Sequence, residues 1–382
     1  MFSEYIVFKS VFIIGNFSIL TFFFLYFIKK KDLRFALSMC TIAFIAITLG
    51  LRNKNVALDT PKYIYIYESA NIQHYYENYV YEPLFIFISI ITKYIFNYYN
   101  LFLMFLTFLH LFLILIAYKN ILKNSLYTIA MAIYISTFTF WLSNLSMLRQ
   151  GLAIAIFTYA LSYLINGKYR KSIILGIITL GIHFSGAIYF IVYFLFKILR
   201  RIYKKPLIFY VLVLLIIFLL LYPDNLFLNL IKNIIKNTLI LFPSNQNLEK
   251  VYWYLIWDKK VEWHIKHVYY LILILFIIYT FILRVFRSSS EIPSLQKSYT
   301  IFTVSLIMLI ILKFDEMVAD RIFMYFVPII PILLVNTYWI LNKNYRFILL
   351  IVFIIGSIIW FNIKVLYLQY SGWFIYPYPS VR

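Results

Sequence analysis

The stretch SNLSMLRQGLAIAIF, residues 143–157, places an arginine and a glutamine at the start of an apolar run. From Gly151 onward the stretch contains only small and apolar residues, which suits a helix in a lipid bilayer. Similar runs recur along the chain, and 64% of its 382 residues are hydrophobic while 13% are charged. This composition excludes a soluble globular protein and predicts an all-α, polytopic transmembrane helical bundle.

Apolar runs of spanning length predict about 10–12 membrane segments in a single integral membrane domain, residues 1–382. The expected spans are 6–28, 35–51, 100–118, 126–142, 150–166, 206–222, 267–283, 299–312, 322–341 and 347–363. Two further apolar stretches, 82–98 and 172–196, are ambiguous. The first span has no basic region before it and no small-residue cleavage site after it, so it is expected to be retained. The one cysteine, Cys40, excludes an internal disulfide.

The net charge is +21, and the basic residues form short clusters between apolar runs. This pattern is typical of cytoplasmic loops, so membrane lipids and a phosphate-bearing lipid substrate are the expected partners, and nucleic acid is not. The densest clusters lie at 29–34, 119–124, 167–171 and 197–205.

All these clusters can lie inside only if 82–98 dips into the outer interface without crossing. The stretch 172–196 must then enter the membrane and return, as a re-entrant or broken hairpin with His183 near its middle. The alternative makes both stretches simple spans, which puts the clusters at 119–124 and 167–171 outside.

The preferred topology has three outer loops, at 52–81, 223–266 and 313–321. The loop at 223–266 begins with a helix that is polar on one face and apolar on the other, which favours an interfacial position. The same topology gathers polar residues at the outer face: Arg52, Asp59, Arg149, His183, Asp315, Glu316, Asp320 and Arg321.

Arg149 and Gln150 lie at a span's end, where an arginine can simply reach into the interface. The small residues that follow allow a neighbouring helix to approach closely, which would hold the guanidinium in position to bind a phosphate with its planar fork. His183, with Ser185 two residues on, could act as a general base or donate to a diphosphate. A structural histidine is the alternative.

In the first outer loop, Arg52 could bind a phosphate, Asp59 a hydroxyl or an arginine, and Tyr63 a sugar ring. The alternative is a set of ordinary interfacial residues. In the last outer loop, Asp320 and Arg321 could pair with each other or meet an acceptor hydroxyl. The histidines and acids lack the spacing of a metal site, and no phosphate-binding loop is present, so no metal and no cofactor are expected.

Four stretches resemble, in this order, the EpsG family of membrane polysaccharide polymerases, to which many Wzy-type O-antigen and capsule polymerases belong. They are LRNKNVALDTPKYIYIYE (51–68), SMLRQGLAIAIF (146–157), GIHFSGAIYF (181–190) and ADRIFMYFVP (319–328). The resemblance implies a metal-independent glycosyltransferase of the bacterial inner membrane. Such an enzyme transfers the growing polysaccharide from undecaprenyl diphosphate to the sugar of a new lipid-linked unit, with its active site facing the periplasm.

The resemblance implies site residues as well. Arg149 is expected to be catalytic together with His183 or Asp59 as the base. The expected substrate-binding residues are Arg52, Tyr63, Gln150, Ser185, Asp320 and Arg321. The chain departs from the family pattern at Ala57 and Leu58, where glycine and threonine are expected, and at Ser146, where many relatives have asparagine. A chain-length regulator and a flippase are expected partners. A flippase of the same lipid-linked units, or a ligase of polysaccharide to lipid, is the alternative function.

Overall fold

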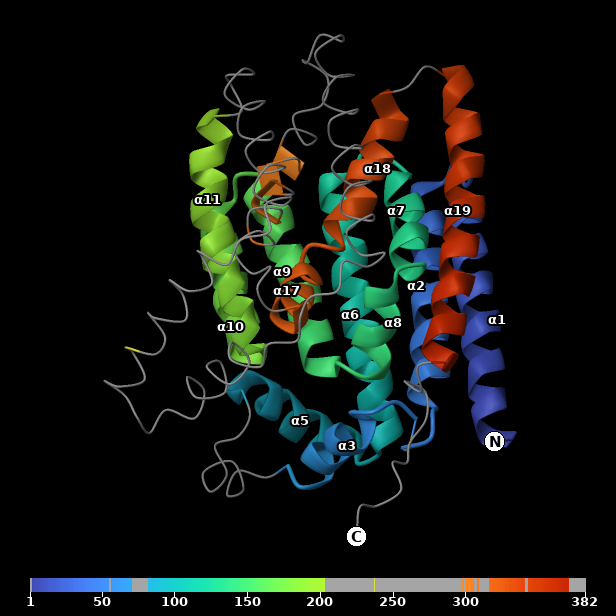
Figure 1. The fold of residues 1–382 in the computed structure, drawn as a ribbon, viewed down its shortest axis with the longest axis vertical. Helices are drawn as coiled ribbons and strands as arrows, with labels where there is room; N and C mark the ends of the chain where they lie inside the picture. The colour runs from blue at the N-terminus through green and yellow to red at the C-terminus, as the bar shows by residue number, and fades with distance from the viewer. Residues whose placement is uncertain are drawn as a thin grey trace. The chain divides into compact units, whose positions relative to one another are not determined.

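The computed structural model describes residues 2–54, 56–70, 82–202, 316–340 and 343–370, with isolated positions between 237 and 308. Within these ranges every regular element is a helix, which confirms the all-α prediction (Figure 1). The chain divides into two compact units, Met1–Tyr193 with Val327–Arg382, and Phe194–Phe326. The predicted spans at 206–222 and 267–283, most of 299–312 and nearly all of the loop at 223–266 lie outside the described residues.

The first unit contains most of the described helices. In chain order they are α1 (Phe2–Leu25), α2 (Lys31–Gly50), α3 (Thr60–Glu68), α5 (Pro83–Phe96), α6 (Tyr99–Ile121), α7 (Leu126–Ile135), α8 (Phe138–Leu145), α9 (Leu148–Ile165), α10 (Tyr169–Ile182), the 3₁₀ turn η1 (Phe184–Ala187), the start of α11 (Ile188–Ile202), α18 (Ile329–Ile340) and α19 (Lys343–Tyr370). The second unit contains the rest of α11 and α17 (Glu316–Phe323).

Among the described residues, four helical segments are long and apolar enough to cross a membrane: Lys31–Gly50, Tyr99–Ile121, Leu148–Ile165 and Tyr345–Leu366. A fifth crossing is possible if α7 and α8, which are bent by 69° at their junction, count as one broken span. The protein is therefore a multi-pass membrane protein.

The expectation of one continuous span at 126–142 is wrong, because the helix breaks at Ser136 and Thr137. The Thr137 hydroxyl accepts from the backbone N–H of Phe140 at 3.3 Å, which caps the start of α8. The span expected at 322–341 is shorter than predicted. Turns occupy the residues before Pro328, and α18 begins at Ile329.

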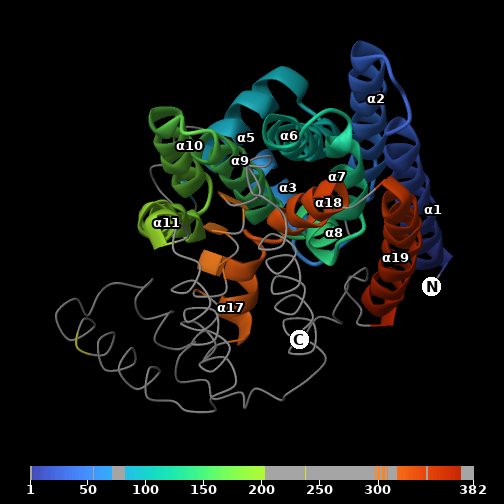
Figure 2. The same ribbon diagram turned by 90° about the horizontal axis from the view of Figure 1, so that it is seen from above.

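Helix α9 lies between α6 and α10 in the first unit (Figure 2). It is the most buried of the candidate spans. At its start it lies close to α8. A Cβ added at Gly151 would lie 2.5 Å from the backbone oxygen of Ser143, so only glycine fits there. The small residues after Arg149 thus permit a close helix approach, as the sequence predicts.

The stretch 82–98 does not carry the chain across the bundle. The Asn100 side-chain amide donates to the Gly50 carbonyl oxygen at 2.8 Å, so α2 ends where α6 begins. Between them, α3 and α5 lie across this end of the upright helices (Figure 1). Helix α5 has 14 residues, about 21 Å of helix, which is shorter than the roughly 30 Å hydrocarbon core. This agrees with the prediction that 82–98 dips in without crossing.

The other end of the first unit contains the basic clusters 29–34, 119–124 and 167–171, and we call it the basic end. The Lys119 ammonium lies 4.0 Å from the ring centroid of Phe35, and the Asn166 side chain donates to the Asn120 carbonyl at 3.0 Å. The start of α2 and the ends of α6 and α9 therefore meet there.

Helices α10 and α11 form an antiparallel hairpin that turns at His183. The His183 backbone is extended, with φ −156° and ψ 128°, and one 3₁₀ turn follows it. The hydroxyls of Ser172 and Tyr189 lie 2.5 Å apart, and the rings of Tyr169 and Tyr193 lie 6.3 Å apart, so α11 runs back along α10. The predicted break at His183 is confirmed.

Candidate active site

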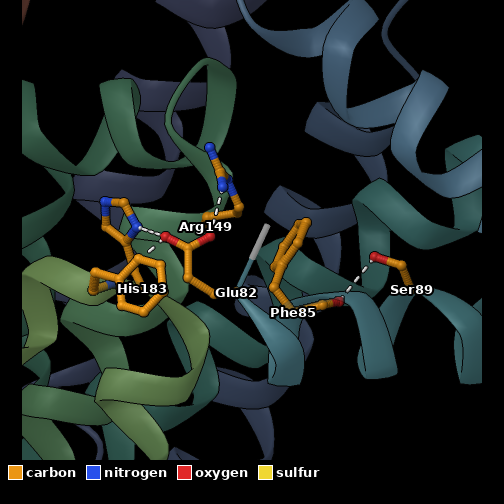
Figure 3. Close-up of polar contacts among 6 residues, drawn as sticks. Glu82, Phe85, Ser89, Arg149 and His183 are labelled. Carbon is orange, nitrogen blue, oxygen red and sulfur yellow. Dashed lines mark hydrogen bonds and ion pairs between the residues drawn. The ribbon is translucent and has the colours of Figure 1, made fainter. Parts of the chain in front are cut away.

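Glu82 lies at the centre of a polar cluster at the end opposite the basic end. It directly precedes Pro83, the first residue of α5, a position that suits proline because no helical N–H is needed there. One carboxylate oxygen of Glu82, Oε2, lies 2.6 Å from Nη1 of Arg149, and the other, Oε1, lies 2.5 Å from Nδ1 of His183 (Figure 3). The Glu82 side chain is 4% exposed, against 17% for Arg149 and 23% for His183, so the acid lies beneath the two basic groups.

Glu82 is ionised in this setting. Burial opposes its charge, but the hydrogen bond from His183 and the charges of Arg149 and His183 outweigh burial and lower the pKa of Glu82 to about 2. A charge-assisted pair of this kind is shorter and stronger than a neutral hydrogen bond. The carboxylate thus fixes the distance between the α9 arginine and the hairpin histidine.

The amino ends of several helices converge around this cluster. Arg149 is the second residue of α9, His183 directly precedes η1, and Glu82 directly precedes α5. Helix α3 also begins here, because the Ser146 hydroxyl donates to Oδ2 of Asp59 at 3.4 Å. Helix amino ends carry partial positive charge and exposed N–H groups, so their convergence beside an arginine favours an anionic ligand.

Arg52 is buried, and its guanidinium binds the backbone. It donates to the carbonyl oxygens of Leu49 at 2.8 Å and Leu145 at 3.3 Å, and the Thr60 hydroxyl donates to the same Leu145 oxygen at 2.9 Å. These contacts attach the first outer loop to the end of α8. Binding of substrate phosphate by Arg52 stays a prediction.

Three further predicted residues lie in the first unit: Tyr63 is buried on α3, Gln150 is buried on α9 and Ser185 lies in η1. The Arg149 guanidinium carbon lies 5.8 Å from the centroid of the Tyr63 ring. Asp320 and Arg321 lie on α17 and are described with the second unit alone. The roles of all these residues stay predictions. In the described ranges, no three His, Cys, Asp or Glu side chains are arranged to hold a metal ion.

Sequence reasoning missed Glu82, although a signal was present. An acid directly before proline at the start of an apolar run marks a helix amino end. The preferred topology had already put this end of the stretch 82–98 at the outer face, with Arg149 and His183.

Comparison with known protein families gives a match to the family model described as the EpsG family, over residues 35–380. The chain belongs to the EpsG family. Members of the EpsG family are Wzy-like polymerases, so the resemblance seen in the sequence is confirmed, and this member has a polysaccharide polymerase-like function of the glycosyltransferase type. No curated protein and no solved structure matches the chain.

Proposed function

We propose that this EpsG-family protein polymerises lipid-linked oligosaccharide repeat units for O-antigen, capsule or exopolysaccharide. It transfers the growing chain from undecaprenyl diphosphate to a hydroxyl at the non-reducing end of a new undecaprenyl-diphosphate-linked unit. The reaction needs no metal and no cofactor, and it takes place at the periplasmic face of the inner membrane, beside a flippase and a chain-length regulator.

One observation carries this proposal beyond the family: Arg149 and His183 share the Glu82 carboxylate where helix amino ends converge. A lipid diphosphate leaves readily when its developing charge is neutralised. Arg149 and the nearby helix amino ends supply such neutralisation, worth on the order of 3 kcal/mol for one well-placed donor. A base next to Arg149 accepts the proton of the attacking hydroxyl.

The charge distribution supports a periplasmic site. Short basic loops face the cytoplasm in most membrane proteins. In the first unit, the clusters at 29–34, 119–124 and 167–171 gather at one end, and the cluster around Glu82 lies at the other.

The test uses cells lacking this gene, complemented with wild type, Arg149→Ala or Arg170→Ala, with surface polysaccharide separated on a gel. Arg170 is an exposed arginine at the start of α10, at the basic end, so it serves as the matched control. We expect single-repeat product without the gene, a full ladder with wild type and Arg170→Ala, and no ladder with Arg149→Ala present in the membrane at normal level.

Two other polysaccharide patterns on the gel would indicate a different function. Loss of even the single-repeat product on deletion would favour a flippase. Free polymer that is no longer joined to its lipid acceptor would favour a ligase. Either result would overturn the polymerase proposal.

A further inference from the structure

The Glu82 carboxylate has a specific geometric relation to the imidazole of His183. Its Oε1 lies 2.5 Å from Nδ1 of His183 and 3.4 Å from the backbone nitrogen of Phe184, while Oε2 binds Arg149. Both carboxylate oxygens are therefore engaged, and the side chain is buried at the start of α5. The carboxylate cannot rotate away without breaking three contacts.

We propose that Glu82 is a positioning residue that makes His183 the general base of the transfer. This inference rests on the proposed function and deepens it. Glu82 holds the imidazole with its proton on Nδ1, so that Nε2 presents a lone pair to the acceptor sugar hydroxyl. The same carboxylate holds Arg149 beside the base, where it meets the diphosphate.

The tautomer follows from hydrogen-bond chemistry. An ionised carboxylate only accepts hydrogen bonds, so Nδ1 of His183 must be the donor at this contact. In a neutral imidazole the other ring nitrogen then has no proton and can accept one. A carboxylate in this position also stabilises the imidazolium that forms when Nε2 takes up a proton.

Asp59, the other candidate base, has a different environment. It accepts from the Ser146 hydroxyl and lies on the α3 side of Arg149, near Tyr63. Within the described residues the buried Glu82 carboxylate binds His183, where it stabilises a proton taken up by the imidazole. The geometry therefore assigns the proton transfer to His183.

The acceptor oxygen forms a bond to the anomeric carbon of the donor sugar while its proton moves to Nε2 of His183. The bond from that carbon to the diphosphate oxygen breaks, and the electron pair leaves with undecaprenyl diphosphate. Release of the proton to water then returns His183 to its starting tautomer.

The test measures the pH dependence of polymerisation by purified protein in liposomes supplied with lipid-linked repeat units. Within the described part of the chain, the charged groups of the ion-pair cluster that contains His183 are Glu82, before α5, and Arg149, on α9 beyond Glu82. In Glu82→Gln the carboxylate charge is lost and that of Arg149 remains, so the imidazolium is less stable. We expect kcat to fall about 100-fold or more while KM changes less than about threefold. The acid limb of the kcat/KM profile should move to lower pH.

Controls separate orientation from folding. Glu68→Gln makes the same change at an exposed acid at the end of α3, and should leave rate and profile unchanged. Glu82→Asp keeps the charge, and its polymerisation rate should be at least about tenfold higher than that of Glu82→Gln. If Glu82→Gln is not obtained folded, the comparison of Glu82→Asp with His183→Ala replaces it, and the aspartate variant must be the faster.

Failure of the Glu82 assignment and failure of the proposed function give different results. If Glu82→Gln keeps the wild-type rate and acid limb while Arg149→Ala and His183→Ala are inactive, the assignment of Glu82 is overturned and the polymerase stands. An increase in KM alone would also overturn it, because Glu82 would then only shape the binding site. If wild-type protein makes no polymer from lipid-linked units, the proposed function itself fails.

Discussion

The Arg52 guanidinium donates its hydrogen bonds to the protein's own backbone. Its hydrogen bonds to the carbonyls of Leu49 and Leu145 connect the end of α2 to the end of α8, and Thr60 reinforces the same contact. Each hydrogen bond from a charged donor contributes about 1.5–3 kcal/mol. Loss of Arg52 removes this donor from the Leu49 carbonyl, whereas the Leu145 carbonyl still accepts from Thr60. Arg52 is therefore expected to stabilise the folded protein, independently of any role in substrate binding.

Arg52→Ala should lower the stability of the detergent-solubilised protein by about 2 kcal/mol or more, and Arg52→Lys by less, because a single ammonium keeps one of the bonds. Thermal unfolding, followed by fluorescence-detected size-exclusion chromatography, measures this change in stability, with Lys54→Ala at an exposed position of the same loop as the control. Unchanged stability together with lost polymerisation would instead make Arg52 a substrate ligand.

Ala57 has a left-handed backbone, with φ +68°, at the position where the family resemblance leads one to expect glycine. A Cβ in this conformation costs about 1 kcal/mol, and glycine avoids the cost. Ala57→Gly should therefore stabilise the protein by about that amount. The matched control is Ala36→Gly, at an exposed position inside α2, which should destabilise by about 1 kcal/mol. Equal effects at the two positions would contradict this account.

At the residue scale, sequence reasoning found Arg149 and His183 but missed the acid that joins them. A polar residue stands out from sequence when it interrupts an apolar run or matches a motif, as Arg149 and His183 do. Glu82 lies at the end of a polar loop, and its one sequence signal, an acid directly before proline, marks a helix amino end but no functional role. Its role depends on a contact with His183, 101 residues away, and no local pattern encodes such a distance.

At the element scale, short helices position the residues of the candidate active site. Helix α8 has 8 residues and lies between the break at Thr137 and the turn before α9. Hydropathy alone predicted one span at 126–142, because the bend of 69° leaves the apolar run uninterrupted. The hairpin break at His183 was predictable, since glycines and a histidine interrupt the apolar run there.

Gly151 is the point at which α9 depends on α8. In Gly151→Ala the new Cβ would lie 2.5 Å from the backbone oxygen of Ser143, so α9 must shift and carry Arg149 with it. We expect a loss of roughly 2 kcal/mol in stability and at least about tenfold in polymerisation. Gly356→Ala, in α19 with open space around it, is the control and should cause no loss. Full activity in Gly151→Ala would show that the close contact is dispensable.

At the scale of the whole molecule, the charge pattern predicted the course of the stretch 82–98, which hydropathy left ambiguous. Counting basic clusters required that 82–98 return to the side it left. The hydrogen bond between Asn100 and Gly50 confirms that return, although no single residue in the stretch marks it. The same counting placed Asp320 and Arg321 at the outer face, and that placement stays a prediction.

Cysteine labelling tests that topology directly. In a Cys40→Ser background, single cysteines replace the exposed residues Lys54, Lys123 and Lys168, and a membrane-impermeant thiol reagent is applied to cells before and after disruption. Because α5 does not cross, we expect Lys54→Cys to react in intact cells, and Lys123→Cys and Lys168→Cys only after disruption. If α5 crossed the membrane, the last two would react in intact cells as well. The candidate active site would then no longer lie opposite the cytoplasmic charges, and the periplasmic assignment would lose its support.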